Sequence, residues 1–495
     1  MNASQRCLPK RPDGVTSICF IGCVFLLIAF QWTAPWLERG HAQSPPPLTL
    51  PHVLRAVEHT HPDLDVALYK IRKAEAKALS AQGGFDPTLN VAGKWAPVGF
   101  YKTRDVDAVL KQATPLWGTE LYAGWRYGRG NFPVYKGDLE TLSAGELRAG
   151  VAVPVWRDGL IDRRRADTRQ TRMSVKANRF MRQAKRLSLF QGAAKAYWKW
   201  VAQGLMLSIQ RQLLEIAETR NRGLSKQVEA GSQASIVLVD NERTVLQRRA
   251  RVMAAERGFQ QATYMLSLYL RDGKKRLVRP GEMRLPERIQ KGRPVAEPVK
   301  TLVQRAFKTR PELKVIRLQQ DIAQVERDFA HNQVAPKLSV HAFASRDLGD
   351  GSESLEPTEF GVGAKFEMPL LLRKERGALQ AADAELASLK AALRGVRNAI
   401  ETEVRDAVSA LKLASQRVGV AHTQEQLAKR LAEAERQRFK EGVSTLVIVN
   451  LREIAEANAA VLRVQALAES HQAYADLQAA TGQLTLDSLS SRQNQ

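Results

Sequence analysis

The chain repeats itself, and this internal duplication constrains the fold more than any other feature of the sequence. The phrase His-Pro-Asp-Leu at 61–64 recurs as Arg-Pro-Glu-Leu at 310–313, and Pro-Thr-Leu-Asn-Val at 87–91 recurs as Pro-Lys-Leu-Ser-Val at 336–340. The two prolines are 25 residues apart in both halves. Matches in the same order predict two tandem copies of one structural plan.

Each copy follows the same order of elements: a helical segment, strands, a very long helix, a glycine turn and a shorter helix. These elements are predicted at 52–84, 88–156, 160–230 and 236–270 in the first half, and at 300–334, 337–369, 371–440 and 446–483 in the second. Between the halves lies a connector rich in proline, glycine and charge. The predicted regions are a first repeat at 43–270, the connector at 271–299, a second repeat at 300–484 and a tail at 485–495.

Four segments alternate between apolar and polar residues with a period of two, which predicts strands with two different faces. They lie at 89–95, 121–127, 146–155 and 359–368. Strands of about ten residues with one apolar face suit a membrane barrel, although a soluble β-sandwich alternates in the same way. A predicted export signal and ten aromatic residues between positions 95 and 156 favour the membrane, where such rings form belts at the interfaces.

The helical segments carry apolar residues at coiled-coil spacing, as in the stripe from Leu386 to Leu411. At 1.5 Å per residue, the segment 160–230 would span roughly 105 Å, which is too long for a compact domain. The two shorter helical segments of each half add up to about the length of its long helix. We therefore expect them to stack end to end beside it and to form a wall of uniform height, with the connector as a belt.

The first 42 residues are predicted to be a secretory signal, because a basic start is followed by an apolar stretch and by small residues at Gly40 and Ala42. An uncleaved membrane anchor is the alternative, and Ile21-Gly22-Cys23 faintly resembles a lipoprotein cleavage box. All three cysteines, Cys7, Cys19 and Cys23, lie in this segment. The mature chain would therefore contain no disulfide and no thiolate metal site.

The signal holds four basic and two acidic residues, so its removal lowers the net charge from +24 to +22. Such a charge would suit nucleic acid or an anionic membrane surface. However, the basic residues are mixed with acids along the predicted helices, and no nucleic-acid-binding motif is present. A solvated basic helical surface is therefore the preferred interpretation, and nucleic acid is not an expected partner.

The sequence contains no constellation that indicates catalysis or a cofactor. His59 and His61 lack further clustered ligands, so we interpret them as a surface pair near a helix end and predict no metal site. Trp198 and Trp200 are expected to pack within and between helices. The run at 163–165 is either a solvated basic stretch or a basic collar below the strands. We therefore expect no enzymatic activity and no cofactor.

The predicted signal, the tandem halves, the strand hairpins and the long helices that end in glycine turns together resemble the TolC-like outer-membrane efflux proteins, or outer membrane factors. The resemblance implies a mostly α-helical chain with a membrane β-barrel: a trimeric 12-stranded barrel above a long periplasmic α-helical coiled-coil barrel. It also implies a passive conduit of a tripartite efflux or secretion system in the outer membrane of a Gram-negative bacterium. The implied partners are two further copies, a periplasmic adaptor (membrane fusion) protein, an inner-membrane transporter and outer-membrane lipid.

The glycine turns correspond to the periplasmic tips of that family, where the adaptor docks and the tunnel narrows. The tip residues are Gly231, Ser232, Ala234, Ser235, Gly442, Ser444 and Thr445. The family often has an aspartate six residues after the tip glycine, but this chain has Val237 and Ile448 there. The aperture candidates are therefore Val237, Leu238, Asp240, Ile448, Val449 and Asn450. The alternative is that these aliphatic residues pack the helical hairpins and that another face lines the pore.

The first strand region is longer than the second, with 67 residues from Pro87 to Pro154 against 33 from Pro336 to Pro369. The extra residues predict either a longer external loop or an added hairpin. Four well-alternating strand sets, with one more at most, cannot enclose a pore in a single chain, because about eight strands are needed to enclose even a packed interior. Three chains of four strands would give the twelve strands of the family. The competing interpretation is a structural periplasmic coiled-coil protein with a soluble β-domain.

Overall fold

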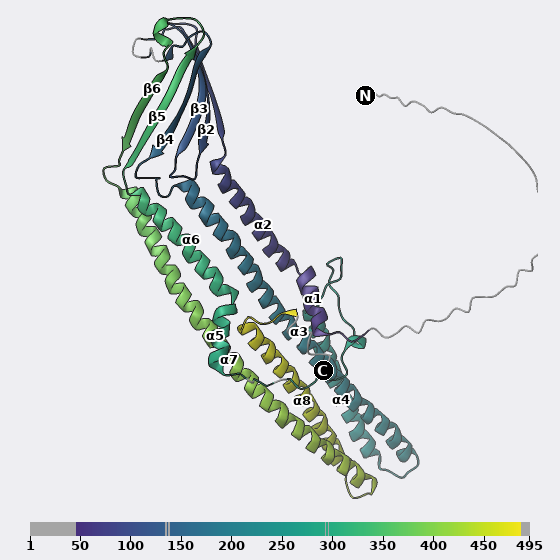
Figure 1. Cartoon of the computed structure of the whole chain (residues 1–495). Helices are drawn as coiled ribbons and strands as arrows, with labels where there is room; N and C mark the ends of the chain where they lie inside the picture. The colour runs from purple at the N-terminus through teal and green to yellow at the C-terminus, as the bar shows by residue number, and fades with distance from the viewer. Residues whose placement is uncertain (1–45, 134–135, 137–138, 293, 296, 487–495) are drawn as a thin grey trace, which may run out of the picture. The chain divides into compact units, whose positions relative to one another are not determined.

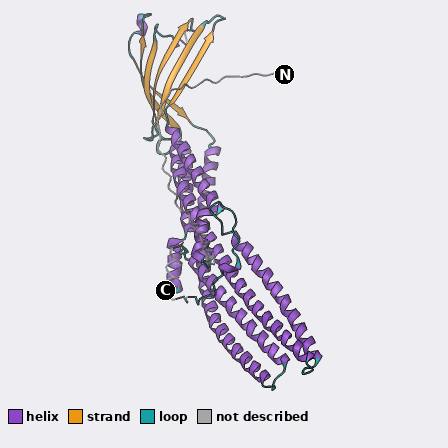
Figure 2. Ribbon diagram, turned by 90° about the vertical axis from the view of Figure 1, so that its right-hand side faces the viewer, coloured by secondary structure: helices purple, strands orange, loops and turns teal. Residues whose placement is uncertain are grey.

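The computed structural model describes residues 46–133, 136, 139–292, 294–295 and 297–486. The predicted signal, its cleavage site and the cysteines lie outside these residues, as does most of the predicted tail. The described part of the chain is mostly helical and carries one β-sheet (Figures 1 and 2). Short 3₁₀ turns in the described part of the chain include Gly83–Phe85, Glu282–Arg284 and Glu353–Leu355.

The first helical segment of each half is broken at the proline of the repeated phrase. Helices α1 (Leu50–Thr60) and α2 (Pro62–Gln82) replace the single segment expected in the first half, and α5 (Val299–Thr309) and α6 (Pro311–Gln333) replace that of the second. The residues between them, His61 and Arg310, are extended, with ψ of 124° and 120°. Proline disfavours the helical conformation in the residue before it, which explains the corrected boundary.

Six antiparallel strands form one sheet in the order of the sequence. They are β1 (Thr88–Ala96), β2 (Thr103–Ala113), β3 (Glu120–Gly130), β4 (Gly145–Pro154), β5 (Lys337–Leu348) and β6 (Glu359–Glu367). The first half therefore contributes four strands and the second half two. The extra length of the first half forms an added hairpin, which was one of the two predicted outcomes.

The expectation of four strands in one chain is wrong, because the sheet has six. Strand β2 was not predicted, because three consecutive apolar residues, Ala108, Val109 and Leu110, interrupt its alternation of apolar and polar side chains. Strand β5 was also absent from the four alternating segments, so the pattern had counted two strands too few.

The long helices begin directly after the strands and run to the glycine turns. Helix α3 spans Arg163–Glu229 and α7 spans Arg373–Lys440, which are 67 and 68 residues or about 100 Å each. The Asp162 carboxylate caps α3 by accepting a hydrogen bond from the Arg165 backbone N–H. After the turns, α4 (Ser235–Ser267) and α8 (Leu446–Ala480) run back toward the sheet. No helix of the described residues combines the length and the apolarity needed to cross a membrane.

The shorter helices stack along the long ones as predicted. Nearer the sheet, α3 packs between α2 and α6, and α6 packs against α7. Nearer the glycine turns, α3 packs between α4 and α8, and α8 packs against α7. The order of neighbours is therefore α2–α3–α6–α7 in one half of the helical part and α4–α3–α8–α7 in the other. Helix α7 is therefore the last helix in both rows. The helix at the opposite edge is α2 in the row near the sheet and α4 in the row near the glycine turns.

The core gathers where the shorter helices meet. Trp200 and Phe190 are fully buried there, and the Tyr197 hydroxyl donates a hydrogen bond to the Leu48 carbonyl at 2.8 Å. Trp198 stacks on His471 of α8 with ring centroids 3.9 Å apart, which confirms the predicted packing between helices. The connector contributes Ile289 to the same cluster. Aromatic packing thus joins α3 to α8 where the shorter helices meet, and Ile289 adds an aliphatic contact from the connector.

Candidate functional site

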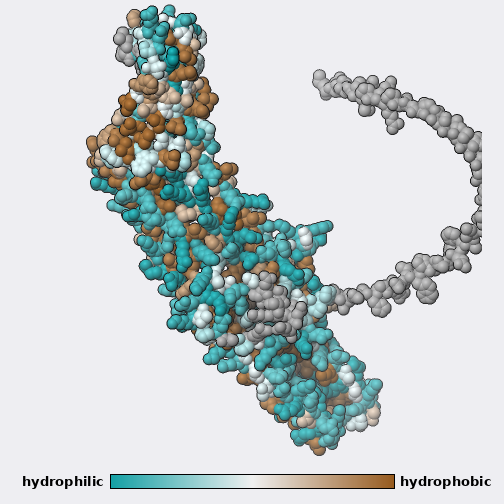
Figure 3. Space-filling view, in the orientation of Figure 1, coloured by the Kyte–Doolittle hydropathy of each residue, from teal (hydrophilic) through white to brown (hydrophobic). Residues whose placement is uncertain are grey.

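The sheet has one apolar and one polar face. Residues that pair across neighbouring strands lie on the same face of the sheet. The strand register therefore assigns each residue to a face, from the pair Leu89 and Leu110 on β1 and β2 to the pair Ala344 and Phe360 on β5 and β6. The apolar face is open to the surroundings, with Trp95 77% and Phe360 82% exposed. In Figure 3 brown surface gathers over the strands, whereas the helices below are mostly teal. The exposed apolar face comprises Leu89, Val91, Trp95, Val106, Leu110, Leu121, Trp125, Leu147, Val340, Phe360, Val362 and Phe366.

Aromatic residues mark both ends of the sheet. Trp95, Trp125 and Tyr127 lie toward the end of the sheet that is farther from the helices. Trp125 stacks on Tyr127. Trp117 and Trp156 lie at the end from which the helices depart, and both are about half exposed. Aromatic belts at the two ends of an apolar band are typical of strands that cross a bilayer.

The polar face carries charged side chains that pair across the strands. Arg126 of β3 contacts Glu146 of β4 at 2.6 Å, and Arg148 of β4 contacts Asp107 of β2 at 2.5 Å. This face can therefore border water, whereas the other face can border lipid. Its charged residues include Lys94, Asp105, Asp107, Lys111, Arg126, Glu146, Arg148, Asp347 and Lys365.

The loop after β3 folds back over this polar face. A side chain at Gly128 would lie 1.8 Å from the Leu139 carbonyl oxygen, so only glycine lets the loop approach here. The Thr141 hydroxyl accepts a hydrogen bond from the Gly128 backbone N–H at 3.1 Å. The Leu142 backbone N–H donates to the Asp347 carboxylate of β5 at 2.9 Å. Residues 139–142 thus cover the polar face at its outer end and narrow the space in front of it.

The two glycine turns at the other end of the chain have the same construction. Gly231 and Gly442 adopt left-handed φ values of 69° and 79°. In each turn, the glycine N–H donates to the carbonyl three residues before it, and the next N–H donates to the carbonyl five residues before it. This is the helix-ending pattern that favours glycine. The duplication seen in the sequence therefore extends to the hydrogen bonds of the turns.

The structure leaves most predicted tip residues at the surface. Gly231, Ser232, Ala234 and Ser235 are exposed in the first turn, and Gly442 and Thr445 in the second. Ser444 is half buried, and its hydroxyl donates to the Glu435 carboxylate. Small side chains therefore form much of the surface of the two turns, beside the exposed Gln233 and Val443.

The six aperture candidates separate into two groups. Val237, Leu238, Asp240 and Ile448 are partly or largely exposed. Val449 is 2% exposed, and the buried Asn450 amide oxygen accepts a hydrogen bond from Arg220 at 2.7 Å. These two residues pack inside the chain. Asp240 pairs with Arg243 at 2.9 Å.

A buried charge cluster, which the sequence analysis missed, joins the two helical hairpins above these turns. Glu453 of α8 is 1% exposed and contacts Arg220 of α3 at 2.5 Å, Arg248 of α4 at 3.1 Å and Arg436 of α7 at 3.4 Å. Burial raises the pKa of Glu453, but the hydrogen bonds and charges of Arg220 and Arg248 outweigh burial and leave the pKa below its usual range. The carboxylate thus stays ionised and ties all four helices together.

The other charged residues considered in the sequence have local structural roles. His61 caps α2, because its Nδ1 accepts a hydrogen bond from the Asp63 backbone N–H. Arg163 contacts Glu326 at 3.0 Å, and Arg165 donates to the Asp158, Gly159 and Leu160 carbonyls. Arg165 therefore fixes the segment between β4 and α3, whereas Arg163 and Arg164 form half-exposed ion pairs with Glu326 of α6 and Glu120 of β3.

The comparisons with known proteins agree with this geometry. Residues 136–270 and 302–483, well over half of the chain, match the family described as outer membrane efflux protein. The chain belongs to the outer membrane efflux protein family. As a member, it is an outer-membrane protein of a Gram-negative bacterium with a periplasmic extension. No curated protein is a significant match in sequence.

Solved structures of outer-membrane channels share the fold of this efflux protein. The channel OprN has a TM-score of 0.64 at 16% identity, and the alignment covers 88% of this chain and 89% of that one. CmeC of Campylobacter jejuni has a TM-score of 0.63 at 14% identity, covering 88% and 85%. The open state of MtrE of Neisseria gonorrhoeae has a TM-score of 0.61 at 16% identity, covering 88% and 89%.

We expect Glu453→Gln to destabilise the helical part by roughly 3 kcal/mol, because it leaves buried arginines without their counter-charge. Because the folded-state pKa of Glu453 is lowered, its contribution is complete above the ordinary glutamate range near ~4.3 and is lost as the pH falls through the folded-state value. Urea unfolding in detergent, followed by far-ultraviolet circular dichroism at several pH values, measures both effects.

Glu469→Gln is the matched control. Glu469 lies on the same helix and pairs with Arg417 at 2.6 Å, but its side chain is 48% exposed. Its replacement should cost less than about 1 kcal/mol. Equal losses in the two variants would contradict a special role for the buried cluster.

Proposed function

We propose that this protein is the outer-membrane channel of a tripartite efflux or secretion system, through which substrates delivered by an inner-membrane transporter and a periplasmic adaptor pass without chemical change. The observation that carries the proposal is the sheet, which has an exposed apolar face, a charged opposite face and two edge strands, β1 and β6. In lipid, such edges require hydrogen-bond partners. A closed barrel of several copies supplies those partners and places the polar face around a water-filled lumen.

The proposed assembly is a homotrimer. One six-stranded sheet is too small to close around a pore, because about eight strands enclose only a packed interior. Three sheets would contribute eighteen strands and a lumen wider than that of the twelve-stranded barrel expected from the resemblance. Strands β1 and β6 run in opposite directions along the sheet, so β1 of one copy can pair antiparallel with β6 of the next.

A structural coiled-coil protein with a soluble β-domain is the second candidate. It accounts for the helices, but it leaves the apolar face of the sheet without a partner. Large side chains such as Phe360 and Val362, 82% and 80% exposed, would then face water across all six strands. A contiguous apolar surface of this kind is typical of a membrane or protein contact. Outer-membrane lipid is therefore the proposed partner of this face.

The glycine turns are the proposed docking site of the adaptor. Their small exposed side chains, such as Ser232 and Ala234, leave room for another helical hairpin to approach closely. The two turns share one backbone geometry, so each copy offers the adaptor two similar surfaces. No catalytic step is required of the channel in this scheme.

Gly442→Trp should abolish export while leaving the assembled protein in the outer membrane, because the indole ring blocks the approach of the adaptor. Gly442→Ala is the matched control, since it imposes the same cost of a left-handed residue, about 1–2 kcal/mol, with little added bulk. Substrate accumulation in cells and the amount of assembled protein are measured together. Normal export by the tryptophan variant would contradict docking at this turn.

The proposed aperture lies just above the turns, where Val237 and Ile448 offer branched aliphatic side chains. A ring of such residues can close a pore by excluding water. Asp240 would add a ring of carboxylates and a cation preference. Its contact with Arg243 at 2.9 Å weakens that preference, because the arginine neutralises part of the charge.

In planar bilayers, Val237→Ser combined with Ile448→Ser should raise single-channel conductance, and Asp240→Asn should reduce cation preference. Val449→Ser is the control: Val449 lies on the same helix but is buried, so it should change stability rather than conductance. If the double variant conducts like the unmodified protein, the constriction lies on another face. A purified protein that forms no channels at all would contradict the proposed function.

A further inference from the structure

Helix α3 begins with a strongly basic segment directly below the sheet. Residues 163–186 include ten lysines and arginines but only one acidic residue, Asp167. The first three arginines are held by the contacts described above. Three further residues, Arg169, Arg172 and Lys176, are exposed, and their side chains have no ion-pair or hydrogen-bond partner among the described residues. These three residues are named the α3 basic stripe.

The α3 basic stripe lies on one face of the helix, because its members are three and four residues apart. Seven-residue steps from Lys176 lead along about the same face to Tyr197 and Gly204. There the face is covered: the Tyr197 hydroxyl donates to the Leu48 carbonyl, and a side chain at Gly204 would lie 2.4 Å from Leu285 of the connector. The connector and the segment before α1 therefore cover this face at mid-height and leave it open near the sheet.

This face of α3 is on the outside of the proposed ring. The helices form the wall of the conduit, so a connector that packs on them as a further layer must lie outside, since inside it would block the passage. The contact between Arg164 and Glu120 agrees with this direction. Glu120 lies on the polar face of the sheet, and Arg164 is roughly 140° around the helix from Arg169. Because α3 lies between α2 and α6, its outer face also stays free where copies meet.

The stripe starts close below the apolar band of the sheet. Trp156 and Leu160, 50% and 69% exposed, mark the end of that band. Arg169 lies about 9 Å into α3 and Lys176 about 20 Å. Side chains on a helix lean toward its N-terminus, which is the sheet end of α3, so all three cations point back toward the band. A headgroup layer of roughly 5–8 Å and a Debye length of about 8 Å bring them within reach of lipid phosphates.

The acidic residues of the flanking helices do not neutralise the stripe. Glu75 of α2 contacts Arg179 at 2.9 Å, and Asp328 of α6 lies 3.8 Å from Arg327. Asp321 of α6 is exposed, but it forms no ion pair with the stripe. The three positive charges are therefore available to a ligand from outside the chain.

We propose that the α3 basic stripe of each copy binds the headgroup of an acidic phospholipid in the membrane leaflet nearest the helices. This inference rests on the proposed function, which places the apolar face of the sheet in a bilayer. Charge complementarity and the position below Trp156 on the outer side of the helices favour a lipid as the occupant. Each lysine or arginine near a membrane surface strengthens the attraction about fivefold. A free phosphate ion would meet the same charges but would gain nothing from the neighbouring apolar band.

The proposal is tested with a phosphatidylglycerol that carries a dye on its acyl chain, titrated with the purified protein in neutral detergent and followed by fluorescence anisotropy. A phosphatidylcholine with the same dye measures binding that does not depend on headgroup charge. The unmodified protein should bind the acidic lipid about tenfold more tightly, and 1 M salt should remove most of the difference, because it shortens the Debye length to about 3 Å. Arg169→Gln, Arg172→Gln and Lys176→Gln together should abolish the preference at low salt, whereas Arg169→Lys with Arg172→Lys should keep it.

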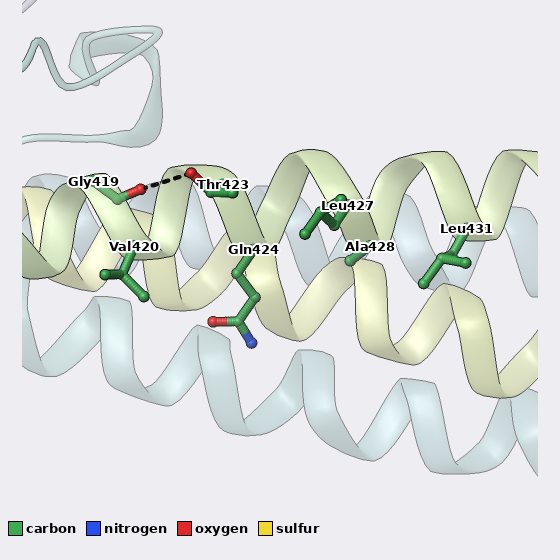
Figure 4. Close-up of a pocket in the computed structure, with 7 residues that line it drawn as sticks. All are labelled: Gly419, Val420, Thr423, Gln424, Leu427, Ala428 and Leu431. Atoms are coloured by element: carbon green, nitrogen blue, oxygen red, sulfur yellow. Dashed lines mark hydrogen bonds between the residues drawn. The ribbon is translucent and has the colours of Figure 1, made fainter.

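The matched control removes three exposed arginines on the part of α4 and α7 that lies farther from the sheet. Arg251→Gln, Arg257→Gln and Arg430→Gln together cost the same charge, and none of these side chains has an ion-pair partner among the described residues. Arg430 lies on the same stretch of α7 as a groove of about 680 Å³, which Figure 4 shows. The residues that line this groove are uncharged, so it offers no second site for an acidic headgroup: Gly419, Val420, Thr423, Gln424, Leu427, Ala428 and Leu431. The control should keep the lipid preference.

Equal binding of the two lipids by the unmodified protein would overturn the proposal, whatever the variants do. Equal losses in the stripe and control variants would also overturn it, because the effect would then follow net charge alone. Displacement of the acidic lipid by an equal concentration of inorganic phosphate would assign the stripe to a free anion. Channel recording on the same preparation separates this test from that of the proposed function. A protein that conducts without a lipid preference loses this inference alone, whereas a protein that forms no channels contradicts the proposed function.

Discussion

The backbone of an edge strand in lipid must find hydrogen-bond partners, and this requirement governs the rest of the molecule. The six-stranded sheet exposes aliphatic and aromatic side chains on one face, and its order leaves β1 and β6 at the ends. Neither can remain unpaired in hydrocarbon. Helix α2 leads into β1 and α7 follows β6, so the same two edges continue into the helices. An assembly that satisfies the strands therefore also brings the edge helices of neighbouring copies together.

Within one chain, two kinds of contact hold the helices in position. Aromatic packing around Trp200 and the stack of Trp198 on His471 fix α3, α8 and the connector at mid-height. Nearer the turns, where few large apolar side chains are buried, Glu453 and its arginines perform the same task with charge. A buried ion cluster depends strongly on geometry, because each charge is costly without its partner. The cluster therefore fixes the position of the α3–α4 hairpin along the α7–α8 hairpin. Apolar packing alone would allow one hairpin to shift along the other.

Much of this fold could be predicted because its signals are long and repeated. The duplicated phrases, the extended heptad stripes and the glycine turns located the long helices to within a few residues. The hairpin that adds β2 was harder, since three consecutive apolar residues hide its alternation. The role of Glu453 could not be read from the sequence, because its partners come from three other helices. The burial of Val449 and Asn450 could likewise not be predicted from the sequence, because it depends on which face of α8 packs against α3.

Electron cryomicroscopy of the protein purified in mild detergent tests the central claim most directly, because it counts the copies and the strands in one particle. The account predicts a threefold particle with a closed barrel of eighteen strands, in which β1 of each copy pairs with β6 of the next. A closed barrel of twelve strands from two copies would contradict the trimer. A single chain whose sheet keeps both edges free would contradict the claim that edge pairing governs the assembly.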